Sequence, residues 1–134
     1  AERTRILLPR AEVARELLPG SLREAGAEVD VVPAYQNLPP EPREVERIRS
    51  LVDPADGDAI LFTSPSTVQT LFDVLGQDPA KRLNALDLFS IGSITTQTAE
   101  RLGLRVAGTS AEQTIESLVA MARAYYAPPG DADA

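Results

Sequence analysis

The sequence has no cysteine and no histidine among its 134 residues. Without cysteine the chain can form neither disulfides nor thiolate metal sites. Without histidine it lacks the commonest metal ligand and the side chain that most often acts as a general base near neutral pH. We therefore expect neither a disulfide nor a metal site.

Long apolar runs and a basic charge balance are missing as well. No run approaches membrane-spanning length, and the first residues lack the charged-then-apolar layout of a signal peptide. The net charge is −7 and the pI is about 4.6, which argues against non-specific binding to nucleic acid. We expect a soluble cytoplasmic domain with no membrane or nucleic-acid partner. Because the sequence opens at Ala1 without a methionine, we also expect a fragment or a trimmed chain.

The clearest local signal lies in residues 59–68, which read as a buried strand, a turn and the start of a helix. Residues 59–62 are all apolar, as is typical of a parallel strand covered on both faces. Ser64 suits the N-cap of a helix and Pro65 suits its first turn. The apolar residues that follow have the spacing of one helix face: Val68, Leu71, Phe72 and Leu75.

The same arrangement of a strand, a hydroxyl-rich turn and a helix recurs twice. Residues 87–91 read as a strand that is followed by the turn 92–96 and a helix ending at Gly103. Residues 104–107 read as a short strand before a turn at 108–114, in which Ser110 with Gln113, or Thr109 with Glu112, could form a capping box. In open α/β sheets, ligands usually bind where such turns leave the carboxyl ends of the strands.

The remaining segments continue the alternation of strands and helices. Pro19-Gly20 interrupts one helical pattern, so we expect a kink or two short helices there, closed by Gly26. The expected segments are strands at 5–9 and 28–33, a linker at 34–42, a helix at 45–51 with a solvated Glu/Arg face, turns at 53–57 and 77–86, a last helix from 115 whose end is covered by Tyr125 and Tyr126, and a disordered tail at 127–134.

Five strand–helix pairs in strict alternation predict an α/β fold with a mostly parallel sheet and helices on both faces. A five-stranded flavodoxin-like sheet is the simplest form. The length suits one domain, and a hydrophobic content of 43% is enough for a packed core.

Taken in order, these motifs resemble the uroporphyrinogen-III synthase family. Residues 60–66 look like the strand-and-turn motif of that family, and residues 90–104 are similar to its second signature, with Ser93 where the family usually has proline. Residues 111–118 resemble the third signature. Residues 7–10 and 32–36 resemble a strand, an arginine and a tyrosine from the second half of such enzymes, with Ala11 in place of a frequent glycine. The resemblance covers nearly all of residues 4–123.

The resemblance implies an enzyme that closes the linear tetrapyrrole hydroxymethylbilane into uroporphyrinogen III, with loss of water, inversion of the last pyrrole ring and no cofactor or metal. It implies two α/β lobes, of which this chain would carry the second half of the sequence. Residues 1–34 would belong to one lobe and about 40–126 to the other. The partner of the chain would be the missing N-terminal half, or a second copy that exchanges residues 1–34.

The substrate carries many carboxylates, and helix N-termini offer N–H donors and positive dipole ends to such groups. The expected binding residues are Arg10, Thr63, Ser64, Pro65, Ser66, Gly92, Thr95 and Thr114. Arg10 would hold a carboxylate in bidentate fashion, and Tyr35 would give a proton or hydrogen bond to the leaving hydroxyl. The hydroxyl residues could equally be plain helix caps, and Tyr35 could be packing.

Two other functions stay open at this point. The first is a non-catalytic ligand-binding or regulatory module built on a synthase-like lobe. The second is a plain flavodoxin-type protein, which is less favoured because the sequence shows neither an acidic phosphoacceptor cluster nor aromatics beside a phosphate turn.

Overall fold

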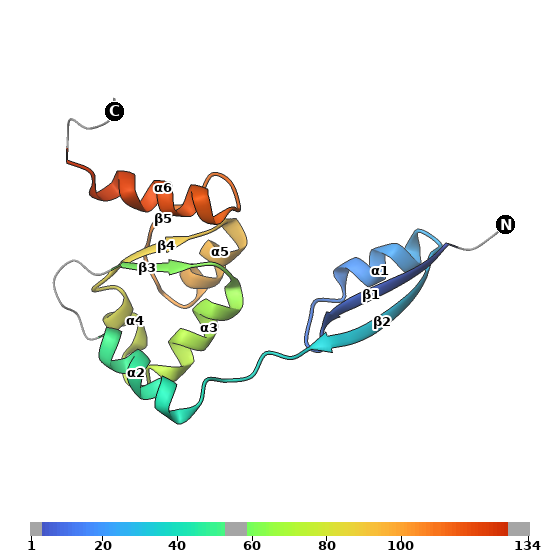
Figure 1. Cartoon of the computed structure of the whole chain (residues 1–134), viewed down its shortest axis with the longest axis horizontal. Helices are drawn as coiled ribbons and strands as arrows, with labels where there is room; N and C mark the ends of the chain where they lie inside the picture. Colours follow the sequence, from blue (N-terminus) through green and yellow to red (C-terminus); the bar gives the residue numbers. More distant parts are fainter. Residues whose placement is uncertain (1–3, 53–58, 129–134) are drawn as a thin grey trace. The chain divides into compact units, whose positions relative to one another are not determined.

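The computed structural model describes residues 4–52 and 59–128. The chain divides into two compact units, Ala1–Pro39 (unit 1) and Pro40–Ala134 (unit 2) (Figure 1). Each unit contains its own parallel sheet.

Unit 1 consists of strand β1 (Arg5–Ala11), helix α1 (Leu17–Glu24) and strand β2 (Glu28–Tyr35). The two strands pair in parallel from Arg5 opposite Glu28 to Arg10 opposite Pro33. The register then shifts so that Ala11 lies opposite Tyr35. Helix α1 packs against the sheet, and Gly26, at φ 92°, takes the left-handed conformation that follows many helix ends.

The expected kink at Pro19-Gly20 is absent, and α1 is one short helix. It begins at Leu17, so Pro19 lies in its first turn, where backbone N–H groups have no partner within the helix. Both strands run two residues further than expected, to Ala11 and Tyr35. Pro9 does not end β1, because an edge strand tolerates a residue without an N–H.

Unit 2 is built on a parallel sheet in the order β3-β4-β5, with β3 at Ala59–Phe62, β4 at Asp87–Ser90 and β5 at Val106–Thr109. Helices α3 (Pro65–Val74) and α5 (Ser93–Arg101) pack on each other and on one face of this sheet. The buried core lies there, formed by Val52, Phe62, Val68, Leu75, Leu83, Leu86, Leu88, Ala99 and Leu104. Helix α2 (Pro42–Val52) and the short helix α4 (Pro79–Leu83) supply part of it.

Helix α6 (Ile115–Tyr126) covers the opposite face of the sheet (Figure 1). Phe89 alternates with Leu88 along β4 and meets the rings of Tyr125 and Tyr126 edge-on, at centroid distances of 5.2 and 6.2 Å. Both phenols donate hydrogen bonds to Asp87, at 3.3 and 2.6 Å. The end of α6 is thus fastened to the first residue of β4.

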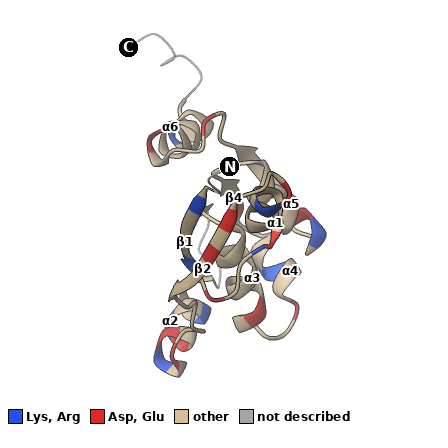
Figure 2. Ribbon diagram, turned by 90° about the vertical axis from the view of Figure 1, so that its right-hand side faces the viewer, with Lys and Arg blue, Asp and Glu red and all other residues tan. Residues whose placement is uncertain are grey.

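Charged residues of both signs occur along α2 (Figure 2). Glu44 and Arg47, and Glu46 and Arg49, form exposed pairs one turn apart at 4.0 Å. Such pairs contribute little to stability, and the run reads as the solvated face that the sequence predicts. Among the helices of residues 4–52 and 59–128, none is long and apolar enough to cross a membrane.

The prediction of one five-stranded sheet is not met in the described residues, which form sheets of two and three strands. A strand–helix alternation fixes the number and direction of strands but not which edges pair. Residues 77–86 contain α4 rather than only a turn. The expected turn at 53–57 lies outside the described residues, as does the expected tail beyond Pro128.

The last strand begins two residues later than expected. Gly103 N–H bonds to Glu100 and Leu104 N–H bonds to Ala99, which are the two hydrogen bonds of a Schellman motif. Leu104 is therefore used to finish α5 and to fill the core, and β5 starts at Val106.

Candidate functional site

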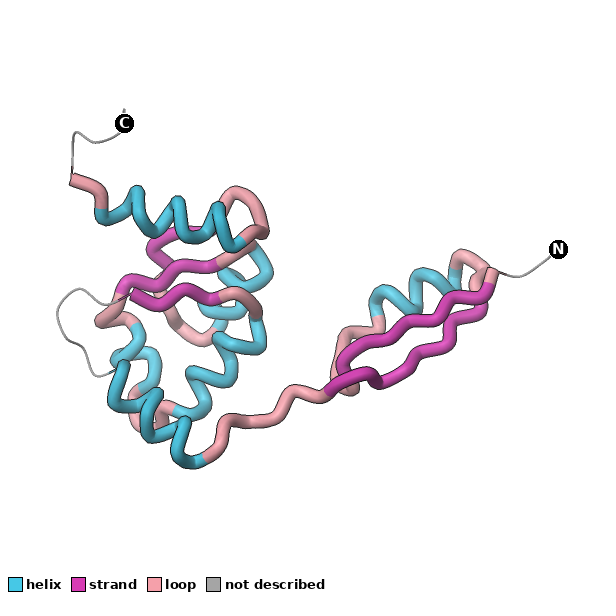
Figure 3. The backbone as a smooth tube through the Cα atoms, viewed as in Figure 1, coloured by secondary structure: helices cyan, strands magenta, loops and turns pink. Residues whose placement is uncertain are grey.

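The carboxyl edge of the unit 2 sheet carries the three hydroxyl-rich turns. The strands run parallel, so each reaches its following helix at the same edge (Figure 3). Backbone hydrogen bonds tie the turns to one another: Ile91 N–H donates to Phe62 at 2.9 Å, and Ser110 N–H donates to Ser90 at 2.8 Å. The turns predicted from residues far apart in sequence therefore form one row.

The first turn has the predicted geometry. Ser64 is the N-cap of α3, in extended conformation, and its hydroxyl accepts the Thr67 N–H at 3.3 Å. The same oxygen lies 3.0 Å from the hydroxyl of Ser66. Pro65 opens the helix, and Thr63 and Ser66 are exposed. Ser64 is thus a true cap, and the neighbouring hydroxyls still face solvent.

The second turn is more enclosed than the first. Gly92 is the N-cap of α5, and a Cβ placed on it would lie 2.9 Å from Cγ of Gln113, whose side chain covers it. Thr95 is only 3% exposed. Of the two residues expected to bind substrate in this turn, neither presents a side chain to solvent, and Gly92 can act only through its backbone.

The third turn ends at Thr114, which caps α6 by accepting the Ser117 N–H at 3.2 Å. The two capping boxes predicted here are wrong, because the helix begins later, at Ile115. The buried Ser110 hydroxyl instead donates its one proton either to the hydroxyl of Ser117, at 2.7 Å, or to the carbonyl of Glu112, at 2.6 Å. Thr114 itself remains exposed.

Arg10 and Tyr35, the other expected site residues, lie in unit 1 at the carboxyl end of its sheet. Arg10 bonds to the carbonyl of Arg15 at 2.9 Å and pairs with the carboxylate of Glu16. The hydrogen bond from Arg10 is the main cause of a pKa of Glu16 below its usual 4.5. Arg10 is therefore engaged rather than free. The Tyr35 side chain is open, with 61% of its surface exposed.

Comparison with known proteins gives this geometry a context. Residues 1–120 match the family described as uroporphyrinogen-III synthase HemD. The chain belongs to the uroporphyrinogen-III synthase family.

Relatives of this family member agree in sequence and in fold. A Methanothermobacter thermautotrophicus relative is 37% identical over 122 residues, which are 87% of this chain and 47% of that protein. The uroporphyrinogen-III synthase of Synechococcus elongatus is 33% identical over 120 residues, 86% of this chain and 45% of its own length. The crystal structure of uroporphyrinogen-III synthetase from Helicobacter pylori has a similar fold, with a TM-score of 0.72 and 18% identity over 92% of this chain and 55% of that one. The chain spans about half the length of the curated relatives it matches.

One hydroxyl cluster of this synthase-family chain was missed by sequence reasoning. The fully buried Ser90 lies 2.5 Å from Thr96, and Thr96 lies 2.6 Å from Thr109, oxygen to oxygen. Thr96 and Thr109 belong to the second and third turn segments, but only the pairing of β4 with β5 brings them together. Gln113 was likewise missed as a residue that contacts Gly92.

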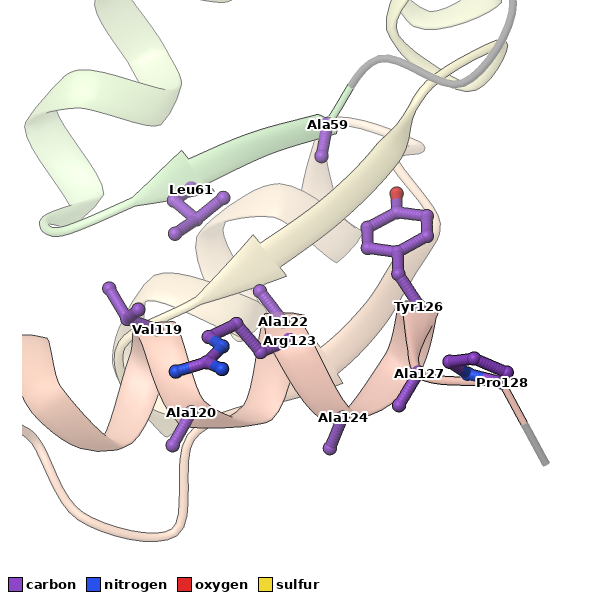
Figure 4. Close-up of a pocket in the computed structure, with 10 residues that line it drawn as sticks. All are labelled: Ala59, Leu61, Val119, Ala120, Ala122, Arg123, Ala124, Tyr126, Ala127 and Pro128. Carbon is purple, nitrogen blue, oxygen red and sulfur yellow. The ribbon is translucent and has the colours of Figure 1, made fainter. Parts of the chain in front are cut away.

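An apolar groove of about 750 Å³ lies between β3 and α6 (Figure 4). Leu61 and Ala59 line it from the strand, and Val119, Ala122 and Tyr126 line it from the helix. It contains none of the residues expected to bind the synthase substrate. The groove follows a face of the sheet, whereas the three turns lie at its carboxyl edge.

No group of three or more acidic side chains in residues 4–52 and 59–128 could hold a metal ion. The chemistry available to this family member at the carboxyl edge is that of hydroxyls and helix N-termini.

Proposed function

We propose that this chain is the carboxyl-terminal half of a uroporphyrinogen-III synthase, which cyclises hydroxymethylbilane to uroporphyrinogen III with loss of water and inversion of the last pyrrole ring. The observation that carries the proposal is the family match over residues 1–120. Its chemical support is the row of three hydroxyl-rich turns at one sheet edge, each opening a helix.

The turns would bind the substrate through its carboxylates. Backbone N–H groups in the first turn of a helix point outward, and the helix dipole favours negative charge there. Thr63, Ser64, Pro65, Ser66, Gly92, Thr95 and Thr114 would form this cradle; Ser64 and Thr114 cap helices, so their hydroxyls would share that role with binding. The net charge of −7 does not prevent this, because donors in contact with the ligand outweigh screened charges further away.

Arg10 and Tyr35 would act from unit 1. A substrate carboxylate would replace Glu16 as the partner of Arg10, an exchange of one carboxylate for another. The exposed phenol of Tyr35 would donate a hydrogen bond or proton to the leaving hydroxyl. The remaining barrier would be lowered mainly by holding the flexible tetrapyrrole in the geometry of ring inversion.

A full synthase would place residues 1–34 in one lobe and residues 40–126 in the other, and the missing N-terminal half or a second copy would complete each lobe. Unit 1 ends at Pro39, and chains shorter than about 40 residues usually need disulfides, metals or association with another chain to fold stably. Unit 2 leaves the apolar groove beside β3 uncovered in the structure, and Leu61 is 39% exposed. Both features support completion to a five-stranded flavodoxin-like sheet by added strands.

Light scattering of the chain, followed by an assay with hydroxymethylbilane and chromatographic separation of the I and III isomers, tests the proposal. A dimer that makes the III isomer would mean that two second halves rebuild the site. Activity that appears only after the N-terminal half is added would also support the proposal. If the reconstituted protein yields only the spontaneously formed I isomer, the catalytic assignment is wrong.

The half-length match also favours a second candidate, a non-catalytic module that binds a tetrapyrrole. Such a module would bind the product with or without the other half and would never accelerate formation of the III isomer. The same assay separates the two functions.

A further inference from the structure

The pairing of β4 with β5 contains an irregularity next to the candidate site. Leu88 lies opposite Val106, but the next pair is Phe89 with Gly108, so Ala107 is an extra residue. Without this shift Ser90 would face Gly108; with it, Ser90 faces Thr109. Such irregularities often re-aim a side chain beside a functional site. Here the shift brings the hydroxyl residue Thr109 opposite Ser90.

Three hydroxyls meet at this point and form a chain that leads outward. Ser90 is fully buried, Thr96 is partly buried and Thr109 is exposed. The oxygen–oxygen distances are 2.5 Å from Ser90 to Thr96 and 2.6 Å from Thr96 to Thr109. The direct distance from Ser90 to Thr109 is 3.5 Å, at the limit of a hydrogen bond.

The direction of the chain follows from counting protons. Each hydroxyl has one proton to donate, so two of the three protons fill the two short contacts. If Ser90 and Thr109 both donated to Thr96, the proton of the partly buried Thr96 would have no acceptor among the residues that the structure describes. If the chain ran inward, Ser90 would donate to the carbonyl of Gly92, which is a poor acceptor at 3.4 Å. If it runs outward, Ser90 donates to Thr96 and Thr96 to Thr109, and the proton of Thr109 is left for a group outside the protein. Hydrogen bonds in such a chain polarise one another, which makes the outer hydroxyl a better donor.

We propose that Thr109 is a substrate-contacting residue that donates a hydrogen bond to a carboxylate of the tetrapyrrole, with Ser90 and Thr96 as positioning residues that fix the direction of its proton. This inference rests on the proposed function, since it takes the acidic tetrapyrrole as the ligand. It adds a side-chain donor to the turn N–H groups at the same edge. Valine has the same branched shape as threonine, with a methyl group in place of the hydroxyl. Thr109→Val therefore removes the hydroxyl with little change of shape.

The test is a fluorescence titration of the 134-residue chain with uroporphyrin III, the stable oxidised form of the expected product. A hydrogen bond to a charged group at an exposed site predicts about tenfold weaker binding for Thr109→Val. Thr109→Ser keeps the hydroxyl and should bind within about twofold of the wild type. Thr70→Val is the matched control, because Thr70 is an exposed threonine on α3 outside the three turns.

A double-mutant cycle separates positioning from general damage to the fold. Thr96→Val should weaken binding severalfold in the wild-type background and have almost no effect in the Thr109→Val background, because Thr96 acts through Thr109. Thermal unfolding of every variant tests whether each is folded at the titration temperature.

The outcomes distinguish this inference from the proposed function. Wild-type binding that Thr109→Val leaves unchanged would overturn the inference and leave the proposed function standing. Equal, additive losses from Thr96→Val in both backgrounds would remove Ser90 and Thr96 as positioning residues. The titration is repeated with the N-terminal half of a relative added, because the proposed site is complete only then. Absence of uroporphyrin III binding under both conditions would count against the proposed function and would overturn the inference with it.

Discussion

Replacing Ser64 by Asp or by Asn separates the capping role of this residue from its proposed role in binding. The Ser64 oxygen accepts the Thr67 N–H and contacts the hydroxyl of Ser66, and both substitutes can accept these hydrogen bonds. Asp and Asn are as good N-caps as Ser, so neither variant should lose the stability of about 1 kcal/mol that a cap supplies. Asp adds a favourable interaction of about 0.3–1 kcal/mol with the helix dipole. The Asp variant should therefore be at least as stable as the wild type.

Binding should respond in the opposite direction. Two like charges about 4 Å apart repel by about 1 kcal/mol in bulk water and about 4 kcal/mol at the effective dielectric constant of a protein surface. A substrate carboxylate held at the N-terminus of α3 would meet this repulsion in the Asp variant only. We expect the Asp variant to bind uroporphyrin III at least about fivefold more weakly than the Asn variant, since 1.4 kcal/mol corresponds to a factor of ten.

The assay is a pair of titrations at low and at high salt, with urea unfolding of both variants in parallel. The Debye length falls from about 10 Å at 0.1 M salt to about 3 Å at 1 M, so the gap between the two affinities should shrink as salt is added. Equal affinities of the Asp and Asn variants at low salt, with both variants folded, would show that no carboxylate binds at this helix end.

Three further predictions follow from the structure. If the proposed synthase activity is reconstituted, Tyr35→Phe should lower turnover and leave thermal unfolding almost unchanged, because Tyr35 is 61% exposed; an unchanged turnover would exclude an acid role. The Glu16 carboxyl has a lower pKa in the folded chain than its usual 4.5. Its contribution to stability is therefore complete above pH 4.5 and is lost as the pH falls through the pKa of the folded state. NMR titration of that carboxyl should give a midpoint below 4.5 that moves up in Arg10→Ala, and a midpoint unaffected by Arg10 would contradict the assigned cause. Leu88→Ala should cost about 2–5 kcal/mol of unfolding free energy in urea, since Leu88 is fully buried; a loss below about 1 kcal/mol would mean that the core collapses around the cavity.

The local signals in the sequence were sufficient for most of unit 2. Ser64 caps α3 and Pro65 opens it, as the pattern of one cap, one proline and a helical apolar repeat predicts. Gly103 ends α5 in the left-handed conformation, at φ 76°. These features depend on residues within one turn of each other, which is why a sequence reveals them.

Features that depend on pairing between distant segments were not visible. The alternation of strands and helices predicted the five strands found in residues 4–52 and 59–128, but not their separation into two sheets. The start of β5 was misplaced because Leu104 finishes a helix instead of opening a strand. The contact of Ser90 with Thr109 requires a register shift that no residue type signals.

The exposure of the candidate site residues was equally hidden from the sequence. Thr95 and Ser66 are both small hydroxyl residues near a helix start, yet Thr95 is buried and Ser66 is exposed. Arg10 reads as a free cation in sequence, whereas Glu16, six residues later, neutralises it in the structure. Whether a turn residue is exposed depends on the segments that pack over it, as Gln113 packs over the backbone of Gly92.

The fastening of Tyr125 and Tyr126 to Asp87 has a practical use. Helix α6 leaves the carboxyl edge at Thr114 and returns to the amino end of β4, where the two phenols bind. A dye, a biotin group or a surface linker attached directly after Pro128 would therefore start from the edge of unit 2 opposite the three turns. Immobilised in that orientation, the chain would present its candidate binding edge to the solution, and tetrapyrrole capture could be followed on a sensor surface without obstruction by the tether.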